Sequence, residues 1–142
     1  MKKVFIDTNV FLDFIAKRGD FYAPAASIIS LASQGEMELA VSSLSFATGS
    51  YVLESHYKMS QHDILKNYKC FITLCGVTTV NEETIRNAVE TPFEDFEDAM
   101  QYHSALMEGA DIIITRNVKD FQKAQIPVLT PQEFLQQLVH PQ

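Results

Sequence analysis

The chain has 142 residues and carries 11 Lys and Arg against 18 Asp and Glu, for a formal charge of −7. Domains cluster at roughly 100–150 residues, so the length predicts a single domain over residues 1–142. The 46% hydrophobic content is ordinary for a globular protein and excludes a disordered or collagen-like chain. The acidic balance argues against general affinity for nucleic acid or an anionic membrane, although it permits a local basic patch.

Targeting and cysteine signals are weak. No stretch reaches the about 20 apolar residues that a membrane-spanning helix requires. Asp7 and Asn9 break the N-terminal apolar run too early for a secretion signal. Cys70 and Cys75 lack the second cysteine pair of a zinc site, so we expect two buried thiols in a reducing compartment. These features predict a cytoplasmic protein.

Short apolar runs alternate with helical patterns along the chain. The apolar runs predict strands at residues 3–6, 39–41, 112–115 and 128–129, and the β-rich segment VTTV predicts a further strand at 77–80. Periodicity and capping residues predict helices at residues 9–17, 24–34, 43–58, 60–74, from 81, 94–108 and from 130. Strands that alternate with helices predict a parallel α/β sheet with right-handed crossovers.

Two of these helices have a readable inner face. In the helix at 24–34, Pro24 is expected at the first position, and the inward side chains are expected to be Ala25, Ile28, Ile29 and Ala32. In the helix at 43–58, the expected inward side chains are Leu44, Ala47, Tyr51 and Val52.

Acidic residues fall at the ends of predicted strands. Asp7 directly follows the first strand, and Asp120 lies shortly after the Ile-rich fourth strand. A further acidic set opens the helix at 94–108 and consists of Glu94, Asp95, Glu97 and Asp98. Ligands of open α/β sheets bind outside the carboxyl ends of the strands, so these residues mark a candidate site.

Carboxylates gathered at one end of a sheet repel each other unless a cation lies between them. Hard divalent ions such as Mg²⁺ or Mn²⁺ take oxygen ligands of this kind, and two such ions can promote phosphodiester hydrolysis. A structural interpretation stays open beside this one. Asp7 could cap the following helix, and acids in a first helical turn interact favourably with the helix dipole.

Three segments in order resemble the PIN domain, a family of metal-dependent ribonucleases that includes the VapC-type toxins of bacterial toxin–antitoxin pairs. These segments read VFIDTNV at 4–10, DFEDA at 95–99 and IITRNVKDF at 113–121. The resemblance implies a three-layer α/β/α sandwich around a parallel sheet of order 3-2-1-4-5. It also implies RNA cleavage with bound Mg²⁺ or Mn²⁺.

Carried over residue by residue, the resemblance implies that Asp7, Asp98 and Asp120 are the metal ligands and catalytic acids. Thr115 would supply an orienting hydroxyl, and Asn117 would complete the acidic end of the site. Two supporting residues are expected around them: Asn9, which would orient Asp7 by hydrogen bonding, and Asp95, at the rim.

One position departs from the family pattern. PIN nucleases usually carry a Glu near the start of the helix after the second strand, and Thr48 stands there in this chain. The nearest acid is Glu54, which at six residues further on lies roughly 120° around a helix and about 9 Å along it. Glu54 therefore cannot replace the missing carboxylate. A weak or inactive PIN-fold module that binds RNA or protein is the alternative to a nuclease.

Partners follow from the same resemblance. Arg116, Lys119 and Lys123 cluster beside the proposed site and could hold RNA phosphates, although ordinary surface solvation explains them equally well. An antitoxin protein and a second copy of the chain are further expected partners. A phosphoacceptor receiver domain is a remote alternative, because this chain lacks the paired acids after its first strand and an acceptor Asp after its third.

Overall fold

A five-stranded parallel sheet forms the centre of the molecule, in a computed structural model that describes residues 1–139. Its order is β3-β2-β1-β4-β5, and every neighbouring pair is parallel, which confirms the expected order. The strands are β1 (Lys3–Ile6), β2 (Glu38–Ser42), β3 (Gly76–Thr78), β4 (Ile112–Ile114) and β5 (Val128–Leu129).

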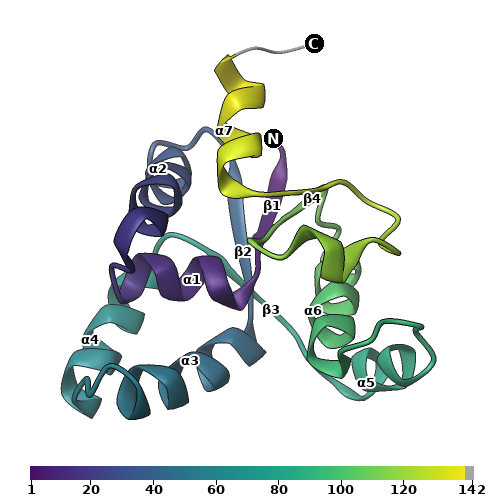
Figure 1. Cartoon of the computed structure of the whole chain (residues 1–142), viewed down its shortest axis with the longest axis horizontal. Helices are drawn as coiled ribbons and strands as arrows, with labels where there is room; N and C mark the ends of the chain where they lie inside the picture. The colour runs from purple at the N-terminus through teal and green to yellow at the C-terminus, as the bar shows by residue number, and fades with distance from the viewer. Residues whose placement is uncertain (140–142) are drawn as a thin grey trace.

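Helices cover both faces of the sheet and give the three-layer arrangement (Figure 1). They are α1 (Thr8–Ile15), α2 (Tyr22–Ser33), α3 (Ser43–Ser55), α4 (Gln61–Phe71), α5 (Glu82–Val89), α6 (Phe96–Met107) and α7 (Pro131–Val139). Two short 3₁₀ helices span Gly19–Phe21 and Val118–Phe121. Helices α1 to α4 and α7 lie on one side of the sheet, and α5 and α6 lie on the other (Figure 1). Pro24 is not at the first position of α2, because the 3₁₀ turn before it runs directly into the helix at Tyr22.

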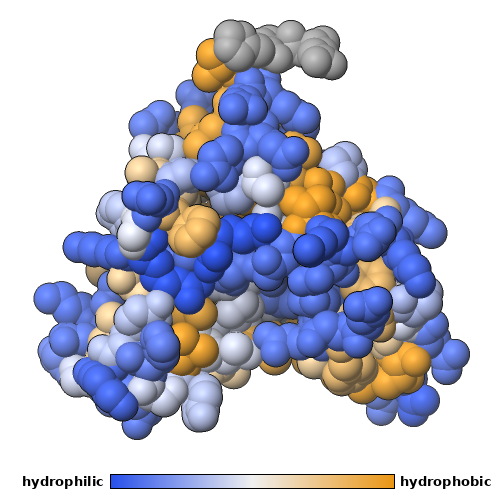
Figure 2. All heavy atoms as spheres, in the orientation of Figure 1, coloured by the Kyte–Doolittle hydropathy of each residue, from blue (hydrophilic) through white to orange (hydrophobic). Residues whose placement is uncertain are grey.

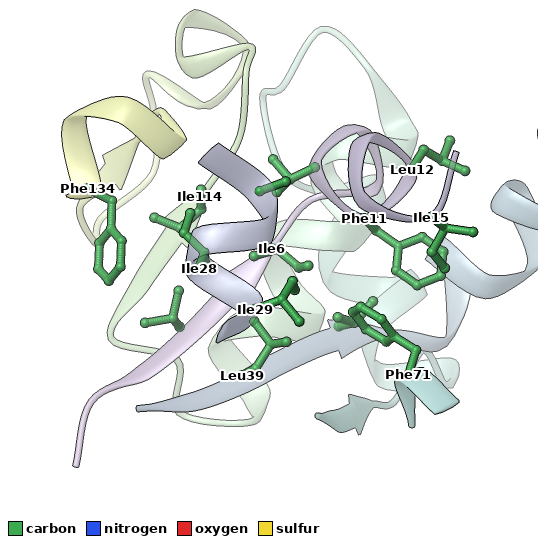
Figure 3. Close-up of a cluster of buried hydrophobic side chains, with 14 of the residues drawn as sticks. Ile6, Phe11, Leu12, Ile15, Ile28, Ile29, Leu39, Phe71, Ile114 and Phe134 are labelled. Atoms are coloured by element: carbon green, nitrogen blue, oxygen red, sulfur yellow. The ribbon is translucent and has the colours of Figure 1, made fainter. Parts of the chain in front are cut away.

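The two faces of the sheet bury separate apolar clusters. Val4 and Ile6 of β1 pack toward α1, α2 and α7, whereas Phe5 between them packs toward α6. The larger cluster gathers aliphatic side chains of the strands against α1, α2 and α7 (Figure 3). Because both faces are covered, β1 reads as a continuous apolar run rather than an alternating one. The apolar run of β1 ends at Ile6, and Asp7 is the first polar residue after it.

The inner face of α3 differs from the expected one. Tyr51 is 74% exposed and Ala47 is also exposed, whereas the buried residues of this helix are Ser45, Gly49 and Leu53. The helix lies so close to α1 that small residues are required at the contact. A Cβ atom at Gly49 would lie 2.9 Å from the Tyr68 hydroxyl and 3.0 Å from Phe11 Cε2. The apolar periodicity was thus a misleading guide to this helix.

The cysteines also differ from expectation. Cys75 is half-buried, and its burial raises the pKa of the thiol to about 11. Cys70 is exposed, because it lies on the outer side of α4, whose buried face carries Ile64 and Phe71. Among residues 1–139, no helix has both the length and the apolar character needed to cross a bilayer.

We predict that Gly49→Ala destabilises the protein by about 1–2 kcal/mol, because overpacking outweighs the gain in helix propensity. The Tyr68 hydroxyl cannot yield freely, since it donates to the Phe46 carbonyl oxygen at 2.9 Å. Urea denaturation measures the change. The control is Ser43→Ala, at an exposed position of the same helix, which should stay within about 0.5 kcal/mol of the wild type. A Gly49→Ala variant as stable as the wild type would contradict the close contact.

Candidate active site

Asp7 is the buried centre of the carboxyl edge of the sheet. It follows β1 directly and is only 6% exposed. Its backbone N–H donates to the Ile114 carbonyl oxygen at 2.9 Å, which ties it to the end of β4. Its side chain is also the N-cap of α1, because Oδ1 accepts the Thr8 N–H at 2.8 Å. The capping interpretation of Asp7 therefore holds, and it leaves the rest of the carboxylate available for other contacts.

Side chains from two further elements hold the Asp7 carboxylate in place. Thr115, buried just after β4, donates its hydroxyl to Asp7 Oδ2 at 2.8 Å. Gln101 of α6 donates from Nε2 to Asp7 Oδ1 at 3.2 Å. Asn9 makes a longer contact with Oδ2, at 3.5 Å, and a second one with the Thr115 hydroxyl, at 3.3 Å. Burial raises the pKa of Asp7, and the hydrogen bonds from Thr115, Thr8 and Gln101 oppose that rise.

Gln101 is a site residue that the sequence analysis missed. It is fully buried, and its Nε2 lies 2.8 Å from Thr8 Oγ1 and 3.0 Å from Ser45 Oγ in addition to Asp7. Its Oε1 accepts the Ser42 hydroxyl. One amide thus joins α1, α3 and α6 beneath the carboxylate. The available signal was its place three residues after Asp98, as a long polar side chain among mostly small or apolar residues on the inner side of α6.

The first turn of α6 brings further acids toward Asp7. Asp95 caps the helix by accepting the Asp98 N–H at 2.9 Å. Burial and the charges of Asp7, Asp95, Asp120 and Glu97, in that order, raise the pKa of Asp98 to about 7. The charge of Asp120 also raises the pKa of Asp7. The structure therefore brings the three predicted ligands, Asp7, Asp98 and Asp120, into one electrostatically coupled group with Asp95 at its edge.

This acidic group suits a divalent cation in its chemistry. Its donors are carboxylate oxygens whose mutual repulsion an Mg²⁺ or Mn²⁺ ion would relieve. The ion pairs among residues 1–139 are Arg18–Asp13, Arg86–Glu82 and Arg116–Asp13, so none of them neutralises the group. Within the same residues, no three His, Cys, Asp or Glu side chains are placed so that together they could hold a metal ion. The acids therefore lie in one region of the molecule without forming a ready-made metal site.

The segment after β4 forms one wall of an open cleft of about 730 Å³. Asp98 and Asp95 line the cleft on the α6 side, and Lys119, Asp120 and Lys123 line it on the opposite side. Asn117 is exposed, and its backbone N–H donates to the Thr115 hydroxyl at 3.1 Å. In the view of Figure 2, hydrophilic residues dominate the middle of the surface, where α1 and the segment after β4 lie.

Arg116 is partly buried and is held against Asp13 of α1 instead of lining the cleft. Its Nε and Nη2 donate to the buried Asp13 carboxylate at 2.8 and 3.2 Å. Its guanidinium also lies 3.9 Å from the centre of the Phe21 ring. Arg18 pairs with the same Asp13 at 2.7 Å. Of the two predicted RNA-binding residues, Lys119 is therefore exposed beside the acids, whereas Arg116 anchors the site segment to α1.

Thr48 and Glu54 complete the set of predicted positions. Thr48 is half-buried on α3, and its hydroxyl donates to Glu97 Oε1 at 3.4 Å. Glu54 is exposed on the same helix and has no contact with the acidic group among the described residues, as its helical spacing predicted. Glu97 belonged to the acidic set in the sequence but was not assigned to the site. Burial, then the charges of Asp95 and Asp7, raise the pKa of Glu97.

Comparison with known proteins places this arrangement in a family. The PIN domain matches residues 3–119, which is most of the chain. This chain belongs to the PIN domain family. It is 29% identical over 138 residues to ribonuclease VapC1 of Aquifex aeolicus, a match that covers 94% of this chain and 93% of that protein.

Solved structures confirm the PIN fold over nearly the whole chain. DNA-bound VapBC from Salmonella typhimurium superposes with a TM-score of 0.68 at 18% identity, covering 92% of this chain and 99% of the other. A toxin–antitoxin complex from Klebsiella pneumoniae gives a TM-score of 0.64 at 21% identity, covering 90% and 97%. The three-layer fold predicted from the sequence is therefore that of VapC-type PIN domains.

We predict that Asp98→Asn stabilises the metal-free protein at pH 8 and has little effect at pH 4. A carboxyl group whose folded pKa lies above its unfolded pKa costs nothing below the unfolded value, about 3.9. The cost grows as the pH rises through the folded value of about 7 and is full above it. Because Asp98 is partly exposed and screened, the expected gain at pH 8 is about 1–2 kcal/mol. Thermal unfolding at both pH values in the presence of a chelator measures it, and equal effects at the two pH values would contradict the electrostatic origin.

Proposed function

We propose that this protein is a metal-dependent endoribonuclease that acts as the toxin of a toxin–antitoxin pair. The observation that carries the proposal is the buried Asp7 carboxylate, fixed by Thr8, Thr115 and Gln101 beside the uncompensated acids Asp98 and Asp120. Membership of the PIN family and the similarity to a VapC ribonuclease support it.

The residues that would hold Mg²⁺ or Mn²⁺ are Asp7, Asp98 and Asp120. A bound divalent ion supplies a Lewis acid for the phosphate oxygens and an activated water at neutral pH. The protein supplies the pre-organisation. Thr115 and Gln101 keep the Asp7 oxygens in fixed directions, so binding a cation requires little rearrangement at this first acid.

The cleft next to the acids provides the space for an RNA strand. Lys119 and Lys123 on its wall would offset part of the repulsion between the acidic group and the phosphates. Lys123 also donates to the Pro92 carbonyl oxygen at 3.1 Å, which links the two walls of the cleft. No residue of the chain needs to form a covalent bond with the substrate, since a water molecule is the nucleophile in this chemistry.

A protein partner fits the same proposal. Several solved structures that share the fold are VapBC or toxin–antitoxin complexes. We propose that an antitoxin binds this chain as well and restrains its activity.

The second candidate function is a PIN-fold module that binds RNA or protein without cutting. The observation in its favour is Thr48, a hydroxyl residue where the family usually places a carboxylate. The two candidates differ in turnover and in metal dependence, so one assay separates them.

We predict that the protein cleaves RNA only after Mn²⁺ or Mg²⁺ is added. We also predict that Asp7→Asn and Asp98→Asn each lower the cleavage rate at least about 100-fold, because substitutions of residues that only support metal ligands already cost about 10–100-fold. The assay incubates metal-free protein with mixed RNA, adds the ion and follows the fragments. The matched control is Asp63→Asn, an exposed acid on α4 far from the edge of the sheet, which should cleave at the wild-type rate. Cleavage without metal, or undiminished in both site variants, would disprove the nuclease. Metal-independent RNA binding without fragments would establish the second candidate.

A further inference from the structure

We propose that Glu97 supplies the fourth carboxylate of the metal site, from α6, in place of the acid that the family usually carries on α3. The contact between Thr48 and Glu97 is the observation behind this assignment. The proposal rests on the metal-dependent function proposed above and identifies a metal ligand that the motif comparison does not reveal.

The Glu97 carboxylate of α6 lies next to Thr48 of α3. Its Oε1 accepts the Thr48 hydroxyl at 3.4 Å, although the two residues are 49 positions apart in the sequence. Thr48 stands where the family has a longer, acidic side chain on the same helix. The Thr48 hydroxyl of α3 and the Glu97 carboxylate of α6 are therefore direct neighbours across the two helices. On this assignment, α6 supplies the acid that α3 lacks.

The Glu97 carboxylate has few partners that compensate its charge. It is half-buried, and its hydrogen bond from Thr48 is near the upper limit of length for such a bond. None of the ion pairs among residues 1–139 includes it. By contrast, the fully buried carboxylate of Asp13 has two arginine partners, Arg18 and Arg116. A partly desolvated carboxylate without a cation is costly, so Glu97 is a group that a bound cation would stabilise.

Glu97 shares the first turn of α6 with one of the proposed metal ligands. It is adjacent to Asp98 in the first turn of α6. Asp120 approaches from the segment after β4, whereas Glu97 is held toward α3. With both included, the carboxylates come from the residue after β1, from the first turn of α6 and from the segment after β4.

A purely structural explanation makes a different prediction. Acids in the first turn of a helix interact favourably with its dipole, and Glu97 is the second residue of α6. Glu83 is the second residue of α5, is exposed and has no side-chain hydrogen bond among the described residues. Glu83→Gln is therefore the matched control, because it removes the same charge from the same helical position away from the site.

The experiment measures Mn²⁺ affinity of the purified full chain by titration calorimetry, and metal-dependent RNA cleavage in parallel. Glu97→Gln keeps the side-chain volume and the acceptor for Thr48 and removes only the charge. We expect it to weaken Mn²⁺ binding at least about 10-fold, while Glu83→Gln binds like the wild type. The double variant Thr48→Glu with Glu97→Gln should regain most of the affinity, because it returns the acid to α3. A structural role cannot be rescued in this way.

The outcomes separate this proposal from the one it rests on. Asp7→Asn serves as the reference for loss of the whole site. If Asp7→Asn abolishes Mn²⁺ binding but Glu97→Gln binds like Glu83→Gln, Glu97 is not a ligand and the nuclease function stands. If the double variant binds Mn²⁺ as weakly as Glu97→Gln while Thr48→Glu alone binds Mn²⁺ normally, an acid on α3 does not replace Glu97. That result would also refute the proposal that the metal-binding acid has moved from α3 to α6. A wild-type protein that neither binds Mn²⁺ nor cleaves RNA would instead refute the proposed function.

Discussion

The structure depends on one buried negative charge at the end of its central strand. A carboxylate that is nearly inaccessible to water is stable only where donors or a cation replace the lost hydration. Asp7 receives donors from the first residue of α1, from α6 and from the segment after β4. These contacts fix where α1 begins and how α6 lies against the sheet, so the site and the fold share the same hydrogen bonds.

The polar layer beneath Asp7 explains the unusual composition of the neighbouring helices. Gln101 needs hydroxyl partners, and Ser45 and Ser42 provide them at the start of α3. Close approach of α3 to α1 then requires Gly49. On the other side of α1, Asp13 is fully buried and paired with Arg116, which follows Thr115 directly. The segment that carries Asp120 is thus anchored to α1 by both main-chain and side-chain contacts.

The sequence was informative wherever one residue type has one dominant role. Continuous apolar runs located four of the strands, and the β-rich segment at 77–80 located β3 to within two residues. The three motif segments led to the strand order and to the group of Asp7, Asp98 and Asp120. It failed for α3, where Tyr51 was expected inside and is exposed, because Ser45 and Gly49 carry no hydrophobic signal. Gln101 and Glu97 escaped for another reason. Their roles arise from partners 94 and 49 residues away, which periodicity and local spacing do not register.

The long separation between Asp7 and Thr115 has a consequence for the timing of assembly. The two residues are 108 positions apart, and β1 is completed only when β2 and β4 pair with its two edges. Contacts between residues so far apart in the sequence form late, because the entropy cost of closing the long loop between them must be met first. A growing chain on the ribosome therefore passes through most of its synthesis with Asp7 already made but with no pocket around it. The polar surroundings of Asp7 therefore come into existence only when the fourth strand and Thr115 have emerged.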